Sequence, residues 1–334
     1  MSVTTKTDSA EFAGITSFLA EHGKVALTVH ESPDGDAIGS EFAMVQALKQ
    51  LGKTVMTCNA DAAPQKFAFL DETNELQVVT TEDQLPADIG DYGLLILDTN
   101  DTNNIGHISE LVLPRVKDHF IIDHHEAEDD ILAGNLIQKS ASSTAEILYQ
   151  LFVALGLEVS YATARALFVA IVFDTGSFVY PKTTATTFGI ARDLVAKGVV
   201  PNEMYARVYE SNSVSSLMLQ SRVFASLELL CDDRVALQVM TQETLQDYGA
   251  QYEEADQIIN IPLMSESVQV SVFFKENNEG RMRCSMRSKG HVNVADIAVR
   301  FGGGGHKTAA GFRCPDGYDK ARQKLLDALV PRLR

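Results

Sequence analysis

The chain of 334 residues is 45% hydrophobic and 22% charged, a composition typical of a soluble globular protein with room for two domains. Its formal net charge of −17 excludes a protein that coats long nucleic acid with a broad basic surface, because phosphate neutralisation dominates such binding. No stretch approaches the ~20 uninterrupted apolar residues of a membrane span, and the N-terminus lacks the pattern of a secretory signal.

The cysteines indicate a reducing compartment. They are widely scattered and form no C-x-x-C pair; the four are Cys58, Cys231, Cys284 and Cys314. This spacing argues against a zinc cluster or a disulfide scaffold. We therefore expect free thiols and a cytoplasmic protein.

The first two thirds of the chain alternate strand-like and helix-like segments. Apolar runs predict buried strands at 24–30, 54–60, 92–99 and 119–125. Helical spacing from Ile38, a capping box formed by Ser143 and Glu146, and the apolar run 161–174 predict helices. This alternation predicts an α/β domain built on a doubly wound, mainly parallel sheet.

The pattern changes after about residue 200. The polar segment 205–224 predicts a helix that connects two domains, and further strands are predicted at 235–240, 268–276 and 281–289. The last two strands are joined by the turn signal NNEG, and a helix at 293–301 leads into GGGGH. We predict a second, smaller α/β domain, with domain limits of 1–212 and 213–334.

Aspartate and histidine side chains follow the predicted strands at the points where they end. The residues are His30, Asp34, Asp36, Asp98, Asp123, His124 and His125, and Asp174 ends the apolar helix. Taken singly, each is an ordinary turn former or helix cap. Ligands of open α/β sheets, however, bind beyond the carboxyl ends of the strands. Together these charges would be expensive to bury unless cations compensate them.

Carboxylate and imidazole ligands without cysteine suit Mn²⁺ or Mg²⁺ better than structural zinc. The set is also larger than one ion needs. A pair of cations about 3.5–4 Å apart, as used in phosphoryl chemistry, fits this number of ligands.

Four motifs along the chain resemble those of the DHH phosphoesterases. In order they are HESPDGDAIGS, LLILDTND, IIDHH and VAIVFDTGSF, and MRSKGHVNVADIAVRFGGGGHKTAAGF resembles the DHH-associated domain that follows them. Length and domain pairing most resemble the NrnA-type branch. These enzymes are oligoribonucleases (nanoRNases) that also dephosphorylate 3′-phosphoadenosine 5′-phosphate (pAp).

The resemblance implies two divalent cations, with Mn²⁺ preferred over Mg²⁺ or Co²⁺. The implied ligands are His30 and Asp34 for the first metal, Asp36, His124 and Asp174 for the second, and Asp98 for both. The implied catalytic residues are Asp98, Asp123 and His125. Asp123 would orient an imidazole, and His125 would lie beside the phosphate and polarise it or assist the leaving group.

The glycine-rich end of the chain is locally basic. Residues 281–313 hold seven Lys and Arg against one Asp, a local charge of +6. Consecutive glycines let backbone N–H groups approach an anion closely. The resemblance places substrate contacts here, to a terminal phosphate or base, at Arg287, Ser288, Lys289, Gly303, Gly304, Gly305 and His306.

Two positions depart from the family pattern without affecting an implied metal ligand. Ser32 stands where the family often has Asn, and the loop 98–106 lacks the family's usual Arg. The role of residues 100–106 therefore stays open.

We expect hydrolysis of short oligoribonucleotides to nucleoside 5′-monophosphates, and of pAp to AMP, by a hydroxide that bridges two metals. A phosphodiesterase for cyclic dinucleotides or linear ones (pApA, pGpG) is the alternative. A non-catalytic nucleotide-binding module is disfavoured by the complete set of ligands, and a pyrophosphatase or exopolyphosphatase by the nucleotide-type second domain. The preferred substrate, the cleavage polarity, the physiological metal and the oligomeric state, including a homodimer, stay open.

Overall fold

The computed structural model describes residues 11–126, 134–210, 213–250, 252–255, 258–277 and 279–333. The chain divides into two compact units, Met1–Ser211 and Asn212–Arg334. Among the described residues, no helix combines the length and the apolar character needed to cross a membrane.

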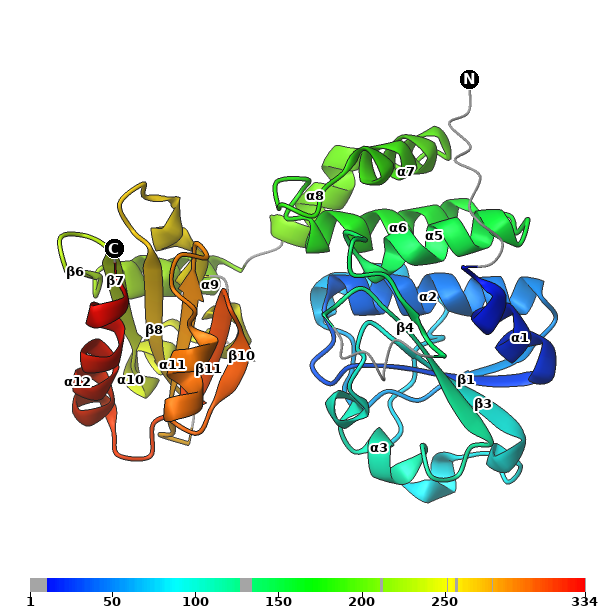
Figure 1. Ribbon diagram of the computed structural model, residues 1–334, viewed down its shortest axis with the longest axis horizontal. Coiled ribbons are helices and arrows are strands. Elements are labelled where there is room, and N and C mark those ends of the chain that lie inside the picture. Colours follow the sequence, from blue (N-terminus) through cyan, green and yellow to red (C-terminus); the bar gives the residue numbers. More distant parts are fainter. Residues whose placement is uncertain are drawn as a thin grey trace. The chain divides into compact units, whose positions relative to one another are not determined.

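The first unit is built on a parallel sheet with the strand order β2-β1-β3-β4-β5 (Figure 1). The strands are β1 (Lys24–Val29), β2 (Thr54–Thr57), β3 (Tyr92–Leu97), β4 (Asp118–Asp123) and β5 (Leu136–Ile137). The prediction of a parallel α/β sheet is therefore confirmed. The strand order reverses between β1 and β3, and such reversals are where open α/β sheets bind their ligands.

Helices stack on one face of this sheet, while the other face has a thinner cover (Figure 1). The first face carries α1 (Ala13–Glu21), α2 (Gly35–Gln50), α5 (Thr144–Ala154), α6 (Tyr161–Asp174), α7 (Ala185–Ala196), α8 (Pro201–Tyr209) and the 3-10 turn η1 (Gln65–Leu70). The second carries α3 (Ile108–Leu111) and the 3-10 turns η2 (Glu82–Gln84), η3 (Ile89–Asp91) and η4 (Thr102–Ile105). The larger core therefore lies on the α2 face.

Helices α2 and α6 cross closely because glycine occupies the contact. A Cβ at Gly39 would lie 2.5 Å from the carbonyl oxygen of Ala166 on α6. Only a residue without a side chain permits this approach. The crossing matters for the site, because it brings Asp174 at the end of α6 near Asp36 in the first turn of α2.

The second unit contains a six-stranded sheet with the order β10-β11-β9-β8-β7-β6, in which β7 and β8 run parallel and the other neighbours antiparallel. The strands are β6 (Glu228–Leu230), β7 (Val235–Met240), β8 (Val270–Glu276), β9 (Met282–Ser288), β10 (Gly304–His306) and β11 (Ala309–Arg313). The strands predicted in this unit are present, and β8 and β9, which flank NNEG, pair antiparallel; the turn itself lies partly outside the described residues.

Helices cover both faces of the second sheet. On one face, α11 (Ala295–Arg300) and α12 (Tyr318–Leu329) pack on the core, and η7 (Val330–Arg332) follows α12. On the other, β7 and β8 are covered by α9 (Val214–Phe224), α10 (Gln242–Tyr248) and the 3-10 turns η5 (Tyr252–Ala255) and η6 (Ile258–Met264). The second domain is thus a mixed α/β unit.

Two local predictions need correction. The segment 205–224 is not one helix: α8 ends at Tyr209, and α9 begins after Ser213, whose hydroxyl accepts a hydrogen bond from the Ser216 N–H as an N-cap. The capping box at α5 is present only in its first half. The Ser143 hydroxyl accepts from the Glu146 N–H, but the Glu146 carboxylate accepts from Ser142 and Thr187.

Candidate metal centre

The ends of β1 and β3 bring three of the predicted ligands together. His30 follows β1, and Asp98 follows β3, its neighbour in the sheet. Asp34 stands at the start of α2, where Oδ1 caps the helix by accepting from the N–H groups of Asp36 and Ala37. The ligand atoms of His30, Asp34 and Asp98 lie within 4.8 Å of one another. This is the set that the sequence implies for the first cation, completed by the shared aspartate.

A second group lies beside the first and contains Asp36, His124 and Asp174, again with ligand atoms within 4.8 Å of one another. His124 Nε2 lies 3.4 Å from Asp174 Oδ2 and 3.8 Å from Asp36 Oδ2. These three residues come from α2, the end of β4 and the end of α6. They are the ligands that the sequence implies for the second cation.

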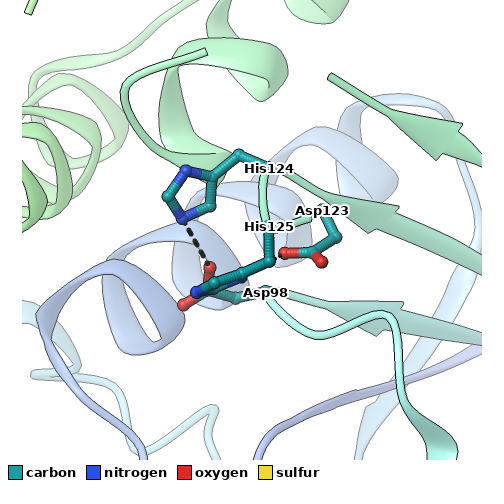
Figure 2. Close-up of side chains that lie close together, drawn as sticks. All are labelled: Asp98, Asp123, His124 and His125. Atoms are coloured by element: carbon teal, nitrogen blue, oxygen red, sulfur yellow. Dashed lines mark hydrogen bonds and ion pairs between the residues drawn. The ribbon is translucent and has the colours of Figure 1, made fainter. Parts of the chain in front are cut away.

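Asp98 faces both groups with different oxygens. Its Oδ1 faces His124 Nε2 (Figure 2), at 3.7 Å, and its Oδ2 lies 3.6 Å from His30 Nε2. The backbone of Asp98 has φ = 63°, which is uncommon outside glycine. Non-glycine residues in this region often mark functional sites. The geometry is that of a carboxylate placed to bridge two ions.

The donor set fits divalent cations. Among the described residues, the buried Nε2 of His124 has no hydrogen-bond partner, and its carboxylate neighbours at 3.4–3.8 Å are too distant for good hydrogen bonds. An ion bound at about 2.0–2.2 Å from each atom would sit between such ligands. Burial lowers the pKa of His124 to about 3, so its imidazole is neutral and keeps the lone pair that a metal requires.

The carboxylates repel one another without a cation. Burial, together with neighbouring carboxylates, raises the pKa of Asp36 to about 6 and that of Asp174 to about 8. The same two causes raise the pKa of Asp98 well above its usual value. Two divalent charges would relieve this repulsion and favour the ionised forms.

The start of α5 holds two of the aspartates in place, and sequence reasoning missed this. The N–H groups of Thr144 and Ala145 donate to Asp36, at 2.7 and 3.1 Å, and the Ser40 hydroxyl donates to it at 3.0 Å. The Thr144 hydroxyl also donates to Asp98 Oδ1 at 2.9 Å. The positive end of the α5 dipole adds to these contacts. Thr144 therefore fixes the spacing between a second-group ligand and the shared one.

Asp123 and His125 form a pair at the edge of the metal ligands (Figure 2). His125 Nδ1 donates to Asp123 Oδ1 at 2.7 Å. The imidazole that Asp123 orients is thus that of His125. Burial opposes charge on both groups, yet the hydrogen bond between them prevails: the pKa of Asp123 is lowered and that of His125 is raised.

The loop without the family's arginine supports this pair. Asn100 Nδ2 donates to Asp123 Oδ2 at 2.7 Å and to the carbonyl oxygen of Glu126 at 3.0 Å. Both oxygens of Asp123 are therefore occupied, which fixes the orientation of His125. The sequence carried no signal for this role of Asn100, since an asparagine in a polar loop is ordinary.

The turn after Asp174 has an unusual backbone. Gly176, Ser177 and Phe178 all have positive φ, at 54°, 59° and 68°. Two of the three are not glycine, so this turn is held by its surroundings. Beyond it, Lys182 Nζ donates to the carbonyl oxygen of His124 at 3.0 Å. The turn thus links the ends of α6 and β4.

In the second unit, the predicted substrate residues Arg287, Ser288 and Lys289 lie at the end of β9. The Ser288 hydroxyl donates to the Val292 carbonyl oxygen and accepts from the Gly290 N–H, so it shapes the turn that follows. Lys289 Nζ donates to the carbonyl oxygens of Ser265 and Glu266. Arg287 is half-buried on the sheet.

The glycine run has a role in strand pairing that does not depend on ligand binding. A Cβ at Gly303 would lie 2.1 Å from the Gly311 carbonyl oxygen, and Gly305 has φ = 135°. Both positions therefore require glycine for the approach of β10 to β11. A Cβ at Gly304 would have open space around it. The side chain of His306 lies outside the described residues.

Comparisons with known proteins agree with this architecture. Residues 24–171 match the DHH family, N-terminal domain, and residues 232–333 match the DHHA1 domain. The chain is 29% identical over 317 residues to the bifunctional oligoribonuclease and PAP phosphatase NrnA of Thermus thermophilus, covering 94% of this chain and 91% of the relative. It is 27% identical to the cyclic-di-AMP phosphodiesterase GdpP of Geobacillus thermodenitrificans, covering 93% of this chain but 48% of that protein.

A solved structure matches almost the whole chain. It is an exopolyphosphatase-related protein from Bacteroides fragilis, with a TM-score of 0.89, 26% sequence identity and 98% of both chains covered. The order of the two matched domains is also the order of the two units. The chain therefore carries a DHH-family domain in its first unit and a DHHA1 domain in its second.

Proposed function

We propose that this chain is a phosphoesterase that uses two divalent cations to hydrolyse short oligoribonucleotides to nucleoside 5′-monophosphates and pAp to AMP. The observation that carries the proposal is the pair of ligand groups that share Asp98. The name of the Thermus relative, an oligoribonuclease and PAP phosphatase of nearly the same length, supports the choice of substrates.

The bound cations would supply positive charge for the attacked phosphate and would lower the pKa of a water molecule. The ligands for them are His30 and Asp34 on one side, and Asp36, His124 and Asp174 on the other, with Asp98 between. Because these are oxygen and imidazole nitrogen donors, we propose Mn²⁺ as the preferred ion.

His125 is the proposed proton donor. The hydrogen bond to Asp123 raises the pKa of His125 against the opposing effect of burial, so the imidazole keeps its proton to higher pH. Its side chain is 42% exposed and can reach a ligand. When water attacks phosphorus and the P–O bond breaks, the leaving oxygen would take this proton. Asn100 and Asp123 keep the ring in position.

A cyclic-dinucleotide phosphodiesterase is the second candidate, because a relative with that name matches 93% of this chain. The chain spans about half the length of that relative, so the likeness concerns only the shared part. The name of the Bacteroides structure adds polyphosphate as a substrate to exclude.

A substrate panel tests the proposal. Metal-free protein, titrated with Mn²⁺, would be assayed on pAp, RNA of two to five nucleotides, cyclic di-AMP, pApA and polyphosphate. We expect turnover of pAp and short RNA, loss on addition of a chelator and recovery with Mn²⁺. Exclusive turnover of cyclic di-AMP or polyphosphate would replace the proposed function.

A further inference from the structure

One face of the second sheet is open over two strands. Side chains on β9 and β11 alternate between its two faces. Cys284, Met286 and Phe312 point into the core beneath α11 and α12. The residues between them lie on the opposite face and are exposed or half-buried: Arg283, Ser285 and Arg287 on β9, and Ala309, Gly311 and Arg313 on β11.

Two arginines stand directly opposite each other on this face. Arg283 and Arg313 are register partners across β9 and β11, and both are exposed. Like charges at such positions are destabilising. Within the part of the chain that the structure describes, neither guanidinium has an ion-pair or hydrogen-bond partner. In a chain of net charge −17, an unneutralised cationic pair indicates an anion from outside the protein.

The next strand carries a third cation at this register, but its side chain is buried. Lys275 of β8 is the register partner of Arg283 on its other side, and its Nζ lies 4.4 Å from the centre of the Tyr252 ring. Gly311 places no side chain beside Arg283, whose Nε lies 3.7 Å from the position that a Cβ of Gly311 would take. A bulky anion can therefore approach the guanidinium across the backbone.

A cavity lies at the same end of the sheet. Its volume is about 890 Å³, and Arg283, Arg313, Tyr252 and Tyr318 are among its lining residues. This volume is in the range of small-ligand sites, and aromatic rings beside cations are typical of surfaces that hold single-stranded nucleic acid. Glu276 also lines the cavity, but its carboxylate accepts a hydrogen bond from the Gln242 N–H at 2.9 Å.

We propose that Arg283 and Arg313 hold a backbone phosphate of an oligoribonucleotide, farther along the strand than the phosphate or base held at Arg287. The proposal rests on the proposed function and names the feature of the substrate that this surface reads. Arg283 and Arg287 are four residues apart on β9, or about 13 Å at ~3.3 Å per residue. The two phosphates of pAp share one ribose and lie closer together than that. The arginine pair therefore favours RNA over pAp.

The test compares two substrates in the full-length chain. For Arg283→Ala/Arg313→Ala we expect the KM for a five-nucleotide RNA to rise about fivefold to tenfold, with kcat/KM for pAp unchanged. The slope of log(kcat/KM) for RNA against log[salt] should become shallower by about 0.7 for each phosphate that the variant no longer neutralises. Arg283→Lys/Arg313→Lys should raise the KM for RNA less than the alanine variant does, because the lysine variant keeps both positive charges.

The matched control is Lys320→Ala/Arg222→Ala. It removes the same charge from exposed positions on α12 and α9, outside the open face of β9 and β11. We expect it to leave both substrates unaffected. An equal rise in the KM for RNA in the control and in the arginine variant would show that only the net charge of the chain matters, and it would overturn the proposal.

An unchanged KM for the five-nucleotide RNA overturns the proposal, and so does an equal loss on pAp and RNA. Fluorescence anisotropy with a labelled five-nucleotide RNA, competed by pAp, separates this test from the proposed function because it needs no turnover. If the wild type hydrolyses neither substrate, the proposed function fails. In that case the proposal for the arginine pair is still supported if Arg283→Ala/Arg313→Ala binds RNA more weakly than the wild type. It is overturned if the wild type and the variant bind RNA equally.

Discussion

The two units of the chain carry their functional charge in opposite ways. In the first, buried carboxylates converge and are held by hydrogen bonds from Ser40, Thr144 and Ala145. In the second, arginines lie on an exposed sheet face, and two of them oppose each other without a carboxylate partner among the described residues. Buried acids require cations held within the protein, whereas exposed bases attract an anion that comes and goes.

This contrast makes the two units separable by experiment. Changes to the buried ligands should reduce turnover of every substrate together with metal binding. Changes to the exposed arginines should alter KM for particular substrates and leave metal binding unaffected.

Apart from the central Asp98, the largest effect is expected for His124→Ala, which removes a buried imidazole that faces three carboxylates. We expect kcat to fall by at least about 10³-fold on pAp and on RNA, with loss of one metal ion per chain. Metal analysis of the dialysed protein and kinetics in Mn²⁺ provide the measurement. Full metal content with near-normal kcat would remove His124 from the ligand set.

A smaller loss is expected for His125→Ala, because it removes the proposed proton donor and leaves the proposed metal ligands in place. We expect kcat to fall by about 10²-fold without a change in metal content. Since the pKa of His125 is raised, the wild-type rate should decline on the alkaline side as this proton is lost, and the variant should lack that alkaline decline. A pH profile that keeps the alkaline limb would assign the proton to another group.

Arg287→Ala tests the binding role that we propose for the second unit. We expect KM for pAp and RNA to rise about tenfold with kcat little changed, since the role proposed for this residue is to bind substrate and not to react. Initial-rate kinetics on both substrates measure this, and Lys320→Ala serves as the control. A fall in kcat at constant KM would contradict a binding role.

The smallest effect concerns Glu41, a buried carboxylate outside the metal groups that accepts from Asn59 Nδ2 at 2.8 Å. Burial raises its pKa from 4.5 to about 8, so the unfolded chain releases this proton at lower pH than the folded one. The contribution of the protonated Glu41 carboxyl to the free energy of unfolding is fully present below pH 4.5. It is lost as the pH rises towards 8.

Glu41→Gln should therefore melt a few degrees above the wild type at about pH 8–9 and near it at about pH 4.5. Thermal denaturation across this pH range measures the difference. The exposed Glu203→Gln is the control, for which no pH-dependent gain is expected. A constant difference between Glu41→Gln and the wild type at all pH values would show that ionisation is not the cause.

Much of the fold and of the ligand convergence could be predicted because both follow from local pattern. Apolar runs ending in Asp or His mark buried parallel strands, and the carboxyl ends of such strands meet at one edge. His30 and Asp98 follow neighbouring strands and lie together for that reason. Their assignment to particular ions rests on the family resemblance and is tested by the variants above.

The supporting contacts were beyond sequence reasoning because they depend on tertiary structure. Thr144 reaches Asp36 and Asp98 through the packing of α5, and Asn100 reaches Asp123 across a loop. The polar run around Ser213 has the sequence pattern of one helix. In the structure the Ser213 hydroxyl caps the start of a second helix, α9. The opposition of Arg283 and Arg313 follows from strand register, which no local pattern specifies.

The most direct test of the two-cation centre is the number of Mn²⁺ ions bound by the wild type and by Asp98→Ala, measured by isothermal titration calorimetry alongside turnover of pAp. We expect two ions per wild-type chain. In the variant we expect weaker binding at both positions and no turnover, because Asp98 faces both ligand groups, with one oxygen toward His30 and the other toward His124. One ion in the wild type, or two tightly bound ions and substantial turnover in Asp98→Ala, would contradict the shared-aspartate centre.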